Sequence, residues 1–263
     1  MAVNYLLNTN RVSIRRMAEL GTFTGHTANL LADLSDSDTR IEIYDLFQHN
    51  SASKQALANH PHFDEDSFFP IWKHNTRRNR QKFELYRGDL NDTFHLSGER
   101  LDFLFVDIVK HASIVNTVVD FYNRMNVGGF LCHQDYYHWQ SPWLVYQMEL
   151  LDDAFVLLGD FGNNMTVYVK TRELTDSEAE FDYVSGLSPQ EKYDLFDRAI
   201  ARHPGIRAGN LMASKLRLSL SDPSFDSKLL ATQIRVEFST NMRINGYVTA
   251  IMNLGDDFFE MKW

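Results

Sequence analysis

The stretch from Met17 to Leu34 constrains the fold more than any other part of the chain. An apolar run, Met17-Ala-Glu-Leu, leads into Gly21-Thr-Phe-Thr-Gly25, and the helix-like segment Thr27-Ala-Asn-Leu-Leu-Ala-Asp-Leu34 follows at once. Because glycine has no Cβ, Gly21 and Gly25 allow positive φ angles and let a ligand approach the backbone closely. The stretch therefore predicts a buried strand, a tight glycine turn and a helix whose first N–H groups face a polar or anionic ligand group.

The glycine spacing indicates which ligand the turn would hold. It differs from the Gly-x-Gly-x-x-Gly of dinucleotide-binding folds, in which a diphosphate lies on the helix N-terminus. Glu19 places a carboxylate inside the turn, where it would repel a diphosphate and attract an amine. This argues against a nicotinamide-dependent oxidoreductase and favours a ligand with an amino group, although similar glycine patterns also occur in ordinary strand-to-helix turns.

Length and charge exclude several classes of protein. A chain of 263 residues suits one α/β domain, or such a domain with a helical appendix. The formal net charge of −9 argues against non-specific binding to nucleic acid or to an anionic membrane. No apolar run approaches the roughly 20 residues of a membrane span, and the start of the chain lacks the apolar core of a signal peptide. We therefore expect a cytoplasmic protein in which the single cysteine, Cys132, is a buried core residue.

Strand-like and helix-like segments alternate from residue 16 to residue 170, which predicts a mostly parallel sheet covered by helices. The clearest strand, Leu101–Asp107, is an apolar run that ends in an acid, as expected of a central strand buried on both faces. The last two runs form an expected antiparallel hairpin. The expected strands after the first are 40–45, 82–87, 101–107, 130–135, 154–158 and 166–170.

Acids follow several of these strands. Asp45 ends a strand about 20 residues after the glycine turn, where an acid can accept hydrogen bonds from both hydroxyls of a ribose. Leu46 and Phe47 come next and could cover an adenine ring. Asp89, with Leu90 after it, follows the next strand and is either a second ligand contact or a helix cap.

Together the Glu-Leu-Gly-Thr-Phe-Thr-Gly turn, the acid at position 45 and the final antiparallel strand resemble class I S-adenosylmethionine-dependent methyltransferases. The resemblance covers residues 16–170. It implies a Rossmann-like, seven-stranded, mostly parallel sheet with helices on both faces, and S-adenosyl-L-methionine as cofactor. The cofactor-binding residues that it implies are Glu19, Gly21, Thr22, Phe23, Thr24, Gly25, Asp45, Leu46, Phe47, Asp89, Leu90 and Asp107.

Within that superfamily the turn and the pair Asp107 and Asp135 are similar to O-methyltransferases of small molecules such as sugars and macrolides. The expected activity is methyl transfer to a hydroxyl of a small polar acceptor. A hydroxyl needs a base or a metal to become a good nucleophile. The residues expected to be catalytic, at the ends of the fourth and fifth strands, are Asp107, Lys110, His111, Asp135 and His138.

A metal is one of two ways to activate the acceptor. Asp107, Gln134 and Asp135 offer oxygen ligands of the kind that Mg²⁺ prefers. However, this chain departs in two ways from the metal-dependent members. Their fifth strand tends to end in two adjacent acids, or an acid and an amide, where this chain has Gln134, Asp135 and Tyr136, and their fourth-strand acid is often followed by a Gly-Asp-x-His-like turn, where this chain has Ile108-Val-Lys-His111. In a metal-free site His111 or His138 would be the base, and Lys110 or Asp135 would orient the acceptor.

The chain divides into three parts on this reading. Residues 1–172 form the cofactor-binding domain, which begins with an unusually early first strand, so the helices that usually precede it are absent or replaced. Residues 173–187, with five acids and no Lys or Arg, are an expected linker. Residues 188–263 form a helical extension, starting at a capping box with Pro at the first helical position, Ser188-Pro-Gln-Glu191. We expect this extension either to form a homodimer interface or to cover the substrate.

Two alternatives remain open from the sequence. The chain could be a non-catalytic subunit whose sheet is a scaffold and whose helical extension recruits a partner. The basic stretch 73–82 in the insertion after Asp45 could be a solvated helix face or a patch that attracts an anionic substrate.

Overall fold

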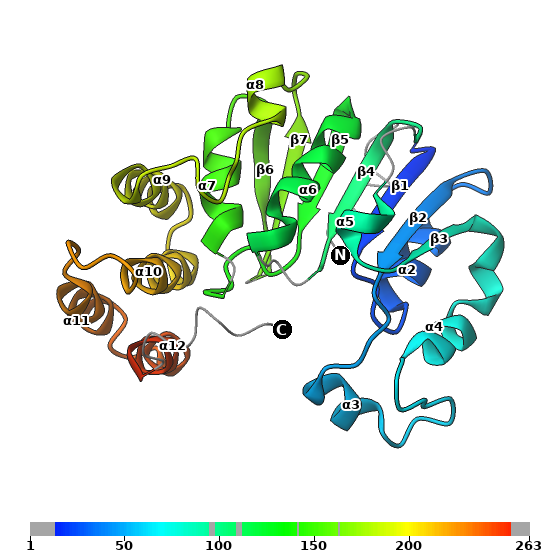
Figure 1. Ribbon diagram of the computed structural model, residues 1–263, viewed down its shortest axis with the longest axis horizontal. Coiled ribbons are helices and arrows are strands. Elements are labelled where there is room, and N and C mark those ends of the chain that lie inside the picture. The colour runs from blue at the N-terminus through cyan, green and yellow to red at the C-terminus, as the bar shows by residue number, and fades with distance from the viewer. Residues whose placement is uncertain (1–13, 95–97, 109–111, 141, 163, 254–263) are drawn as a thin grey trace.

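A computed structural model of the protein describes residues 14–94, 98–108, 112–140, 142–162 and 164–253. These residues form a seven-stranded sheet in the order β3-β2-β1-β4-β5-β7-β6 (Figure 1). Strands β1 to β5 are parallel, and β7 is antiparallel to both β5 and β6. The bounds are β1 Arg16–Leu20, β2 Arg40–Asp45, β3 Phe83–Arg87, β4 Leu101–Val106, β5 Met125–His133, β6 Phe155–Phe161 and β7 Met165–Lys170. The predicted fold class is confirmed.

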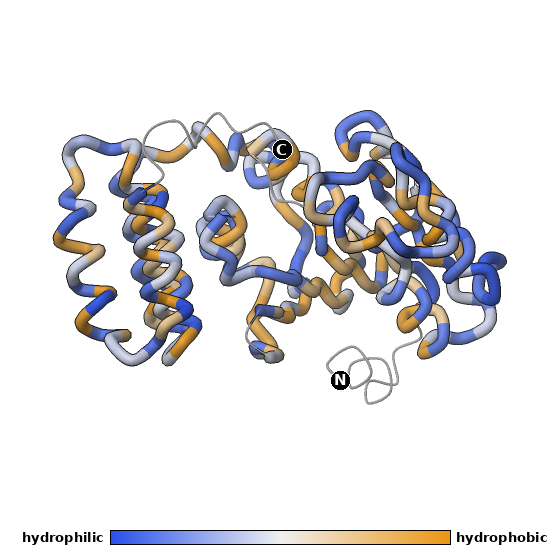
Figure 2. Tube along the Cα trace, turned by 90° about the horizontal axis from the view of Figure 1, so that it is seen from below, coloured by the Kyte–Doolittle hydropathy of each residue, from blue (hydrophilic) through white to orange (hydrophobic). Residues whose placement is uncertain are grey.

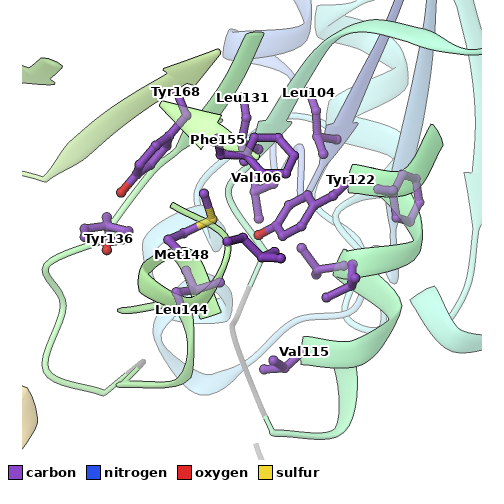
Figure 3. Packing of buried hydrophobic residues seen from close by; sticks show 14 of the residues in the cluster. Leu104, Val106, Val115, Tyr122, Leu131, Tyr136, Leu144, Met148, Phe155 and Tyr168 are labelled. Carbon is purple, nitrogen blue, oxygen red and sulfur yellow. The ribbon is translucent and has the colours of Figure 1, made fainter. Parts of the chain in front are cut away.

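Helices cover both faces of the sheet because side chains along each buried strand alternate between two apolar layers. Leu104 and Val106 belong to the layer beneath α5 (Leu90–Thr93), α6 (Ala112–Arg124) and α7 (Pro142–Leu150). Figure 3 shows these two side chains packed with Tyr122 of α6 and Met148 of α7. Phe103 and Phe105 belong to the opposite layer, beneath α2 (His26–Leu34) and α4 (Phe69–Asn75). The expectation of a central strand buried on both faces is therefore correct.

The insertion between β2 and β3 contains α3 (Ser51–Leu57), α4 and a 3₁₀ helix, η1 (Arg77–Lys82). Two of its basic side chains have structural partners. The Lys82 ammonium is buried and donates hydrogen bonds to the carbonyls of Ala32, at 2.7 Å, and Ser35, at 2.9 Å. It thus satisfies carbonyl groups at the C-terminus of α2. Arg78 pairs with Asp33 on the same helix. For these two residues the structure favours a structural role over an anion-binding patch.

Residues 173–187, expected as an acidic linker, pack against the sheet domain. They include a short helix, α8 (Asp176–Ala179), and Tyr183, which is 1% exposed. Two of its five acids have basic partners from outside the segment: Glu173 pairs with Lys170 and Arg100, and Glu178 with Arg172. Part of the local excess of acids is therefore balanced by neighbouring basic residues.

The helical extension consists of α9 (Pro189–Arg202), α10 (Ile206–Ser219), α11 (Ser227–Glu237) and α12 (Met242–Asn253). The predicted capping box is present, since the Ser188 side chain accepts from Glu191 N and the Glu191 side chain accepts from Ser188 N. Helices α9 and α10 pack on α7, while α10, α11 and α12 enclose an apolar cluster of their own that also contains Trp139. In Figure 2 the extension lies beside the sheet domain. The apolar residues of this cluster are thus buried within the chain, whereas Leu229, Val236 and Met242 of the extension are exposed.

A buried ion-pair network joins β1, β2 and α6. Glu42 accepts two hydrogen bonds from the Arg124 guanidinium, at 2.9 and 2.8 Å, and one from Arg16 Nε at 2.9 Å. The Tyr44 hydroxyl donates a fourth at 2.8 Å. Burial raises the pKa of Glu42, but these charged and hydrogen-bonding partners outweigh it, so that the pKa lies below its ordinary value. These hydrogen bonds connect β1 and β2 of the sheet to α6.

None of the helices in the described part of the chain combines the length and apolar character needed to cross a bilayer.

Candidate functional site

The glycine turn between β1 and α2 has the backbone conformation that its sequence requires. Gly21 and Gly25 adopt φ angles of 82° and 85°, and Phe23 between them has a φ of 47°. A Cβ on Gly21 would lie 2.5 Å from the carbonyl oxygen of Asp107, the residue directly after β4. Only glycine fits so close to the neighbouring strand. The turn is therefore placed at the carboxyl ends of β1 and β4, where parallel sheets bind ligands.

Asp45, at the end of β2, holds this turn in place. One carboxylate oxygen accepts hydrogen bonds from the backbone N–H groups of Thr22, at 2.8 Å, and Phe23, at 3.1 Å. The other accepts from Phe47 N at 2.6 Å. Burial raises the pKa of Asp45 above its ordinary value, and these three bonds offset only part of the rise. Since a carboxylate has about four acceptor positions, about one is left for a ligand hydroxyl.

Glu19 lies beneath the turn and is fully buried. Neither of its carboxylate oxygens makes a hydrogen bond to a described residue. Burial raises the pKa of Glu19 well above its ordinary value; the nearby Thr22 hydroxyl offsets part of the rise, and repulsion from Asp107 and Asp45 adds to it. Among the described residues this buried carboxylate has no cationic partner and only the neutral Thr22 hydroxyl to stabilise it, which is costly. The group therefore marks a position where a cationic or hydrogen-bond-donating ligand group would be stabilised.

Helix α4 also holds the glycine turn in place, through two side-chain hydrogen bonds. Trp72 Nε1 donates to the Thr22 hydroxyl at 3.1 Å, and the Asn75 side-chain amide donates to the carbonyl of Thr24 at 3.0 Å. Each of these contacts joins two residues that are about fifty positions apart in the sequence. Sequence reasoning did not identify these two residues, because nothing local to residues 72–75 shows that they reach the turn.

We expect Gly25→Ala to lower the free energy of unfolding by about 1–2 kcal/mol. The alanine would have to keep a left-handed φ, and its Cβ would lie 2.5 Å from the Thr76 methyl group and 2.9 Å from Trp72. Urea denaturation would measure the loss. The matched second variant is Gly25→Ala with Thr76→Ser, which removes that methyl and should recover part of the stability. An unchanged midpoint in Gly25→Ala would show that the turn is not constrained as described.

The other residues expected around the cofactor differ in exposure. Leu46 and Phe23 are 43% and 44% exposed beside Asp45, so their side chains are accessible to a ligand. Phe47 is fully buried among the rings of Phe68, Phe69 and Trp72, and only its backbone N–H reaches the site. Asp89 caps α5 by accepting from Asn91 N at 2.9 Å, and Leu90 is buried in the core. The cap is thus one role of Asp89.

The residues expected to be catalytic come from the ends of β4 and β5. Asp107 is exposed, and its backbone N–H donates to the carbonyl of Leu20 at 2.8 Å. Asp135 has a φ of 55° and accepts from the Asn164 amide at 3.2 Å, while His138 N donates to the Asp135 carbonyl at 2.9 Å. Because β4 and β5 are adjacent, their carboxyl ends lie side by side.

Two further candidates, Lys110 and His111, lie outside the described residues. Of the expected metal ligands, Gln134 directly follows β5 and donates its backbone N–H to the Val106 carbonyl, at the end of β4, at 3.0 Å. Across the described residues, no group of three or more His, Cys, Asp or Glu side chains is arranged to hold a metal ion. The expectation of Mg²⁺ gains no support from these side chains.

Three aromatic residues that follow β5 lie in the apolar core. Tyr136 and Tyr137 are almost fully buried, and Trp139 belongs to the apolar cluster of the helical extension. Tyr247 of α12, which sequence reasoning did not identify, lies next to His138, with ring centroids 6.3 Å apart. The extension therefore reaches the candidate catalytic loop.

Comparison with models of known protein families gives no match, and neither does comparison with curated proteins. Solved structures with a similar fold include the O-methyltransferase NovP, at 18% identity over 65% of this chain and 78% of that chain, with a TM-score of 0.49. An O-methyltransferase from Bacillus cereus in complex with SAH has 15% identity over 64% of this chain and 80% of that one, with a TM-score of 0.45. An rRNA methylase from Streptococcus thermophilus has 14% identity, coverage of 65% and 95%, and a TM-score of 0.47. Likeness at these values concerns the fold alone.

Proposed function

We propose that the protein is an S-adenosylmethionine-dependent methyltransferase. The observation that carries this proposal is the buried Glu19 carboxylate beneath the glycine turn, beside Asp45. A dinucleotide would bring a diphosphate towards this carboxylate, which is unfavourable. The cofactor of a methyltransferase instead carries an amino-acid ammonium and a ribose, so that one carboxylate meets a cation and the other meets hydroxyls.

The residues of the turn fit such a cofactor. Glu19 would hold the ammonium, and the remaining acceptor position of Asp45 would hold a ribose hydroxyl. Leu46 and Phe23 offer exposed apolar surface for the adenine. Asp89, which directly follows the Gly88 whose N–H donates to the Asp45 carbonyl, would accept from the adenine amino group. Thr24, Gly25 and Leu90 shape the turn and its surroundings. When bound, the cofactor supplies an electrophilic methyl group on a sulfonium.

On the acceptor side the protein mainly has to align the two reactants, because methyl transfer is an in-line displacement. We assign the acceptor as a hydroxyl of a small polar molecule. His138 would remove the hydroxyl proton as a general base, and Asp135 and Asp107 would orient the acceptor through hydrogen bonds. Lys110 and His111 remain candidates for the same tasks. In this proposal the helical extension covers the acceptor rather than serving primarily as a homodimer interface.

Isothermal titration with S-adenosylhomocysteine tests the proposal. We expect binding in the micromolar range, abolished or weakened at least tenfold by Asp45→Ala, with Asp152→Ala as the control because Asp152 lies in the turn after α7 and pairs with Arg202. The titration should be run with and without Mg²⁺, so that any metal requirement is seen directly. No heat at high micromolar ligand would contradict the proposal. Binding without methyl transfer to any member of a hydroxyl library would favour the non-catalytic scaffold.

A further inference from the structure

The loop between β5 and α7, residues 134–140, carries two residues that the proposed function places at the acceptor, Asp135 and His138. Asp135 and His138 are partly exposed, whereas Tyr136 and Tyr137 are buried. Figure 3 shows Tyr136 beside Tyr168 of β7. The conformation of this loop thus decides where the acceptor residues lie, and the contacts of its buried side chains decide its conformation.

Tyr137 anchors the loop to the helical extension. Its hydroxyl donates a hydrogen bond to Asp160 of β6, and lies 2.8 Å from Nδ1 of His203, the residue that ends α9. His203 Nδ1 is also 2.9 Å from the second carboxylate oxygen of Asp160. The guanidinium of Arg207, on α10, lies 3.7 Å from that same oxygen. The 134–140 loop and the junction between α9 and α10 therefore meet at one carboxylate of β6.

The hydrogen positions in this cluster follow from its geometry. The single hydroxyl proton of Tyr137 goes to Asp160, so Tyr137 cannot donate to His203 as well. An unprotonated Nδ1 would face a carboxylate oxygen at 2.9 Å with no proton between them. Nδ1 of His203 must therefore carry a proton and donate it to Asp160. Tyr137 and His203 are each 1% exposed, so water does not compete for these bonds.

A second set of contacts from the extension holds the end of the loop. Arg217 of α10 donates to the carbonyl of Gln140 and stacks on the Trp139 ring, with its guanidinium carbon 5.7 Å from the ring centroid. Tyr247 of α12 packs against both Trp139 and His138, with ring centroids 6.2 and 6.3 Å apart. The extension therefore contacts the loop on both sides of His138.

We propose that Tyr137, Asp160 and His203 are positioning residues through which the helical extension fixes the 134–140 loop, and with it the placement of Asp135 and His138. The inference rests on the proposed function for its catalytic consequence, but the coupling between extension and loop does not depend on it. Buried networks of this kind are rigid when every member is paired, and they loosen when one donor is removed.

The test compares His203→Leu, which removes the donor, with His203→Asn, whose amide can donate from a similar position. Hydrogen–deuterium exchange in the loop should speed up about tenfold or more in His203→Leu, as loss of a bond to a charged group predicts, and return towards the wild-type rate in His203→Asn. The affinity for S-adenosylhomocysteine should stay within about twofold in both variants, since neither touches the glycine turn. The rate of methyl transfer to any acceptor that is found should fall in His203→Leu and recover in His203→Asn.

Ile41→Ala is the matched control. Ile41 is buried in β2, in the apolar cluster on the other face of the sheet, which contains no residue of the 134–140 loop or of the extension, so its truncation destabilises the protein without touching the anchor. Unchanged loop exchange in His203→Leu, or equally fast exchange in Ile41→Ala, would overturn the inference while leaving the proposed function intact. Failure of the wild-type protein to bind S-adenosylhomocysteine would overturn the function, and the exchange result would still decide the coupling.

Discussion

Replacing Glu19 by Gln is expected to stabilise the free protein at pH 8 and to weaken binding of S-adenosylhomocysteine by tenfold or more. Glu19 is fully buried, its oxygens have no hydrogen-bond partner among the described residues, and burial raises its pKa well above the ordinary value. A group whose pKa is raised on folding contributes most stability below the pKa of the unfolded chain, about 4.5. That contribution is lost as the pH rises towards the folded pKa.

The gain from Glu19→Gln should therefore be close to zero at pH 4.5 and grow with pH, by at most about 1.4 kcal/mol per pH unit. Urea denaturation at several pH values would measure it. The binding loss has the opposite origin, since the neutral amide no longer attracts the ammonium of the ligand. A gain that is absent at pH 8 would show that Glu19 has a partner in the free protein.

Isothermal titration calorimetry would test Glu19 in a second way, through the protons released when the ligand binds. At a pH below the raised pKa of Glu19, binding of an ammonium beside it should convert its carboxyl to a carboxylate and release a proton, which titrations in buffers of different ionisation enthalpy detect. The Gln variant should release none from this position. Glu149→Gln is the matched control, because Glu149 is also buried with a raised pKa, through burial opposed by Arg202 and Arg198, but lies on α7 outside the site. It should leave proton release on binding unchanged.

Replacing Arg124 by Met is expected to cost about 3 kcal/mol of folding free energy, since the buried Glu42 carboxylate then keeps only Arg16, the more exposed of its two charged partners. The side chains of Glu42 and Arg124 are 1% and 5% exposed and share two hydrogen bonds. Because the pKa of Glu42 is lowered on folding, its contribution is present above about 4.5 and lost as the pH falls. The cost of Arg124→Met should shrink correspondingly in acid.

Denaturation curves at pH 7 and pH 4 would measure this effect. The control is Arg100→Met, which removes an ion pair to Glu173 whose side chains are about half exposed, and which should cost less than about 1 kcal/mol. Adding Glu42→Gln to Arg124→Met should restore part of the loss, because no buried charge then remains. Equal costs for Arg124→Met and Arg100→Met would contradict the role given to the network.

The features that could be predicted from sequence are those determined by neighbouring residues. The glycine turn follows from Gly21 and Gly25 and their φ angles, the buried strand from the apolar run 101–106, and the start of α9 from Ser188 and Glu191. Each depends on residues within one element, so local periodicity and capping chemistry suffice.

What the sequence did not show depends on contacts between distant residues. The acids of 173–187 suggested a linker because their basic partners, Arg100 and Arg172 among them, lie outside the segment. Tyr137 and His203 are 66 residues apart, and only the packing of the extension on α7 brings them together. In the same way, the burial of Phe47 depends on an aromatic cluster supplied by the insertion.

The bracing of the glycine turn by Trp72 and Asn75 bears on the thermodynamics of ligand capture. With Thr22 and Thr24 tied to α4, and Asp45 holding two of the turn's N–H groups, the chain has already lost its conformational freedom at this place when it folds. A ligand that arrives here need not order the backbone, so association should be fast and carry little entropic penalty from the protein. The fold thus prepares its binding surface before the partner molecule is present.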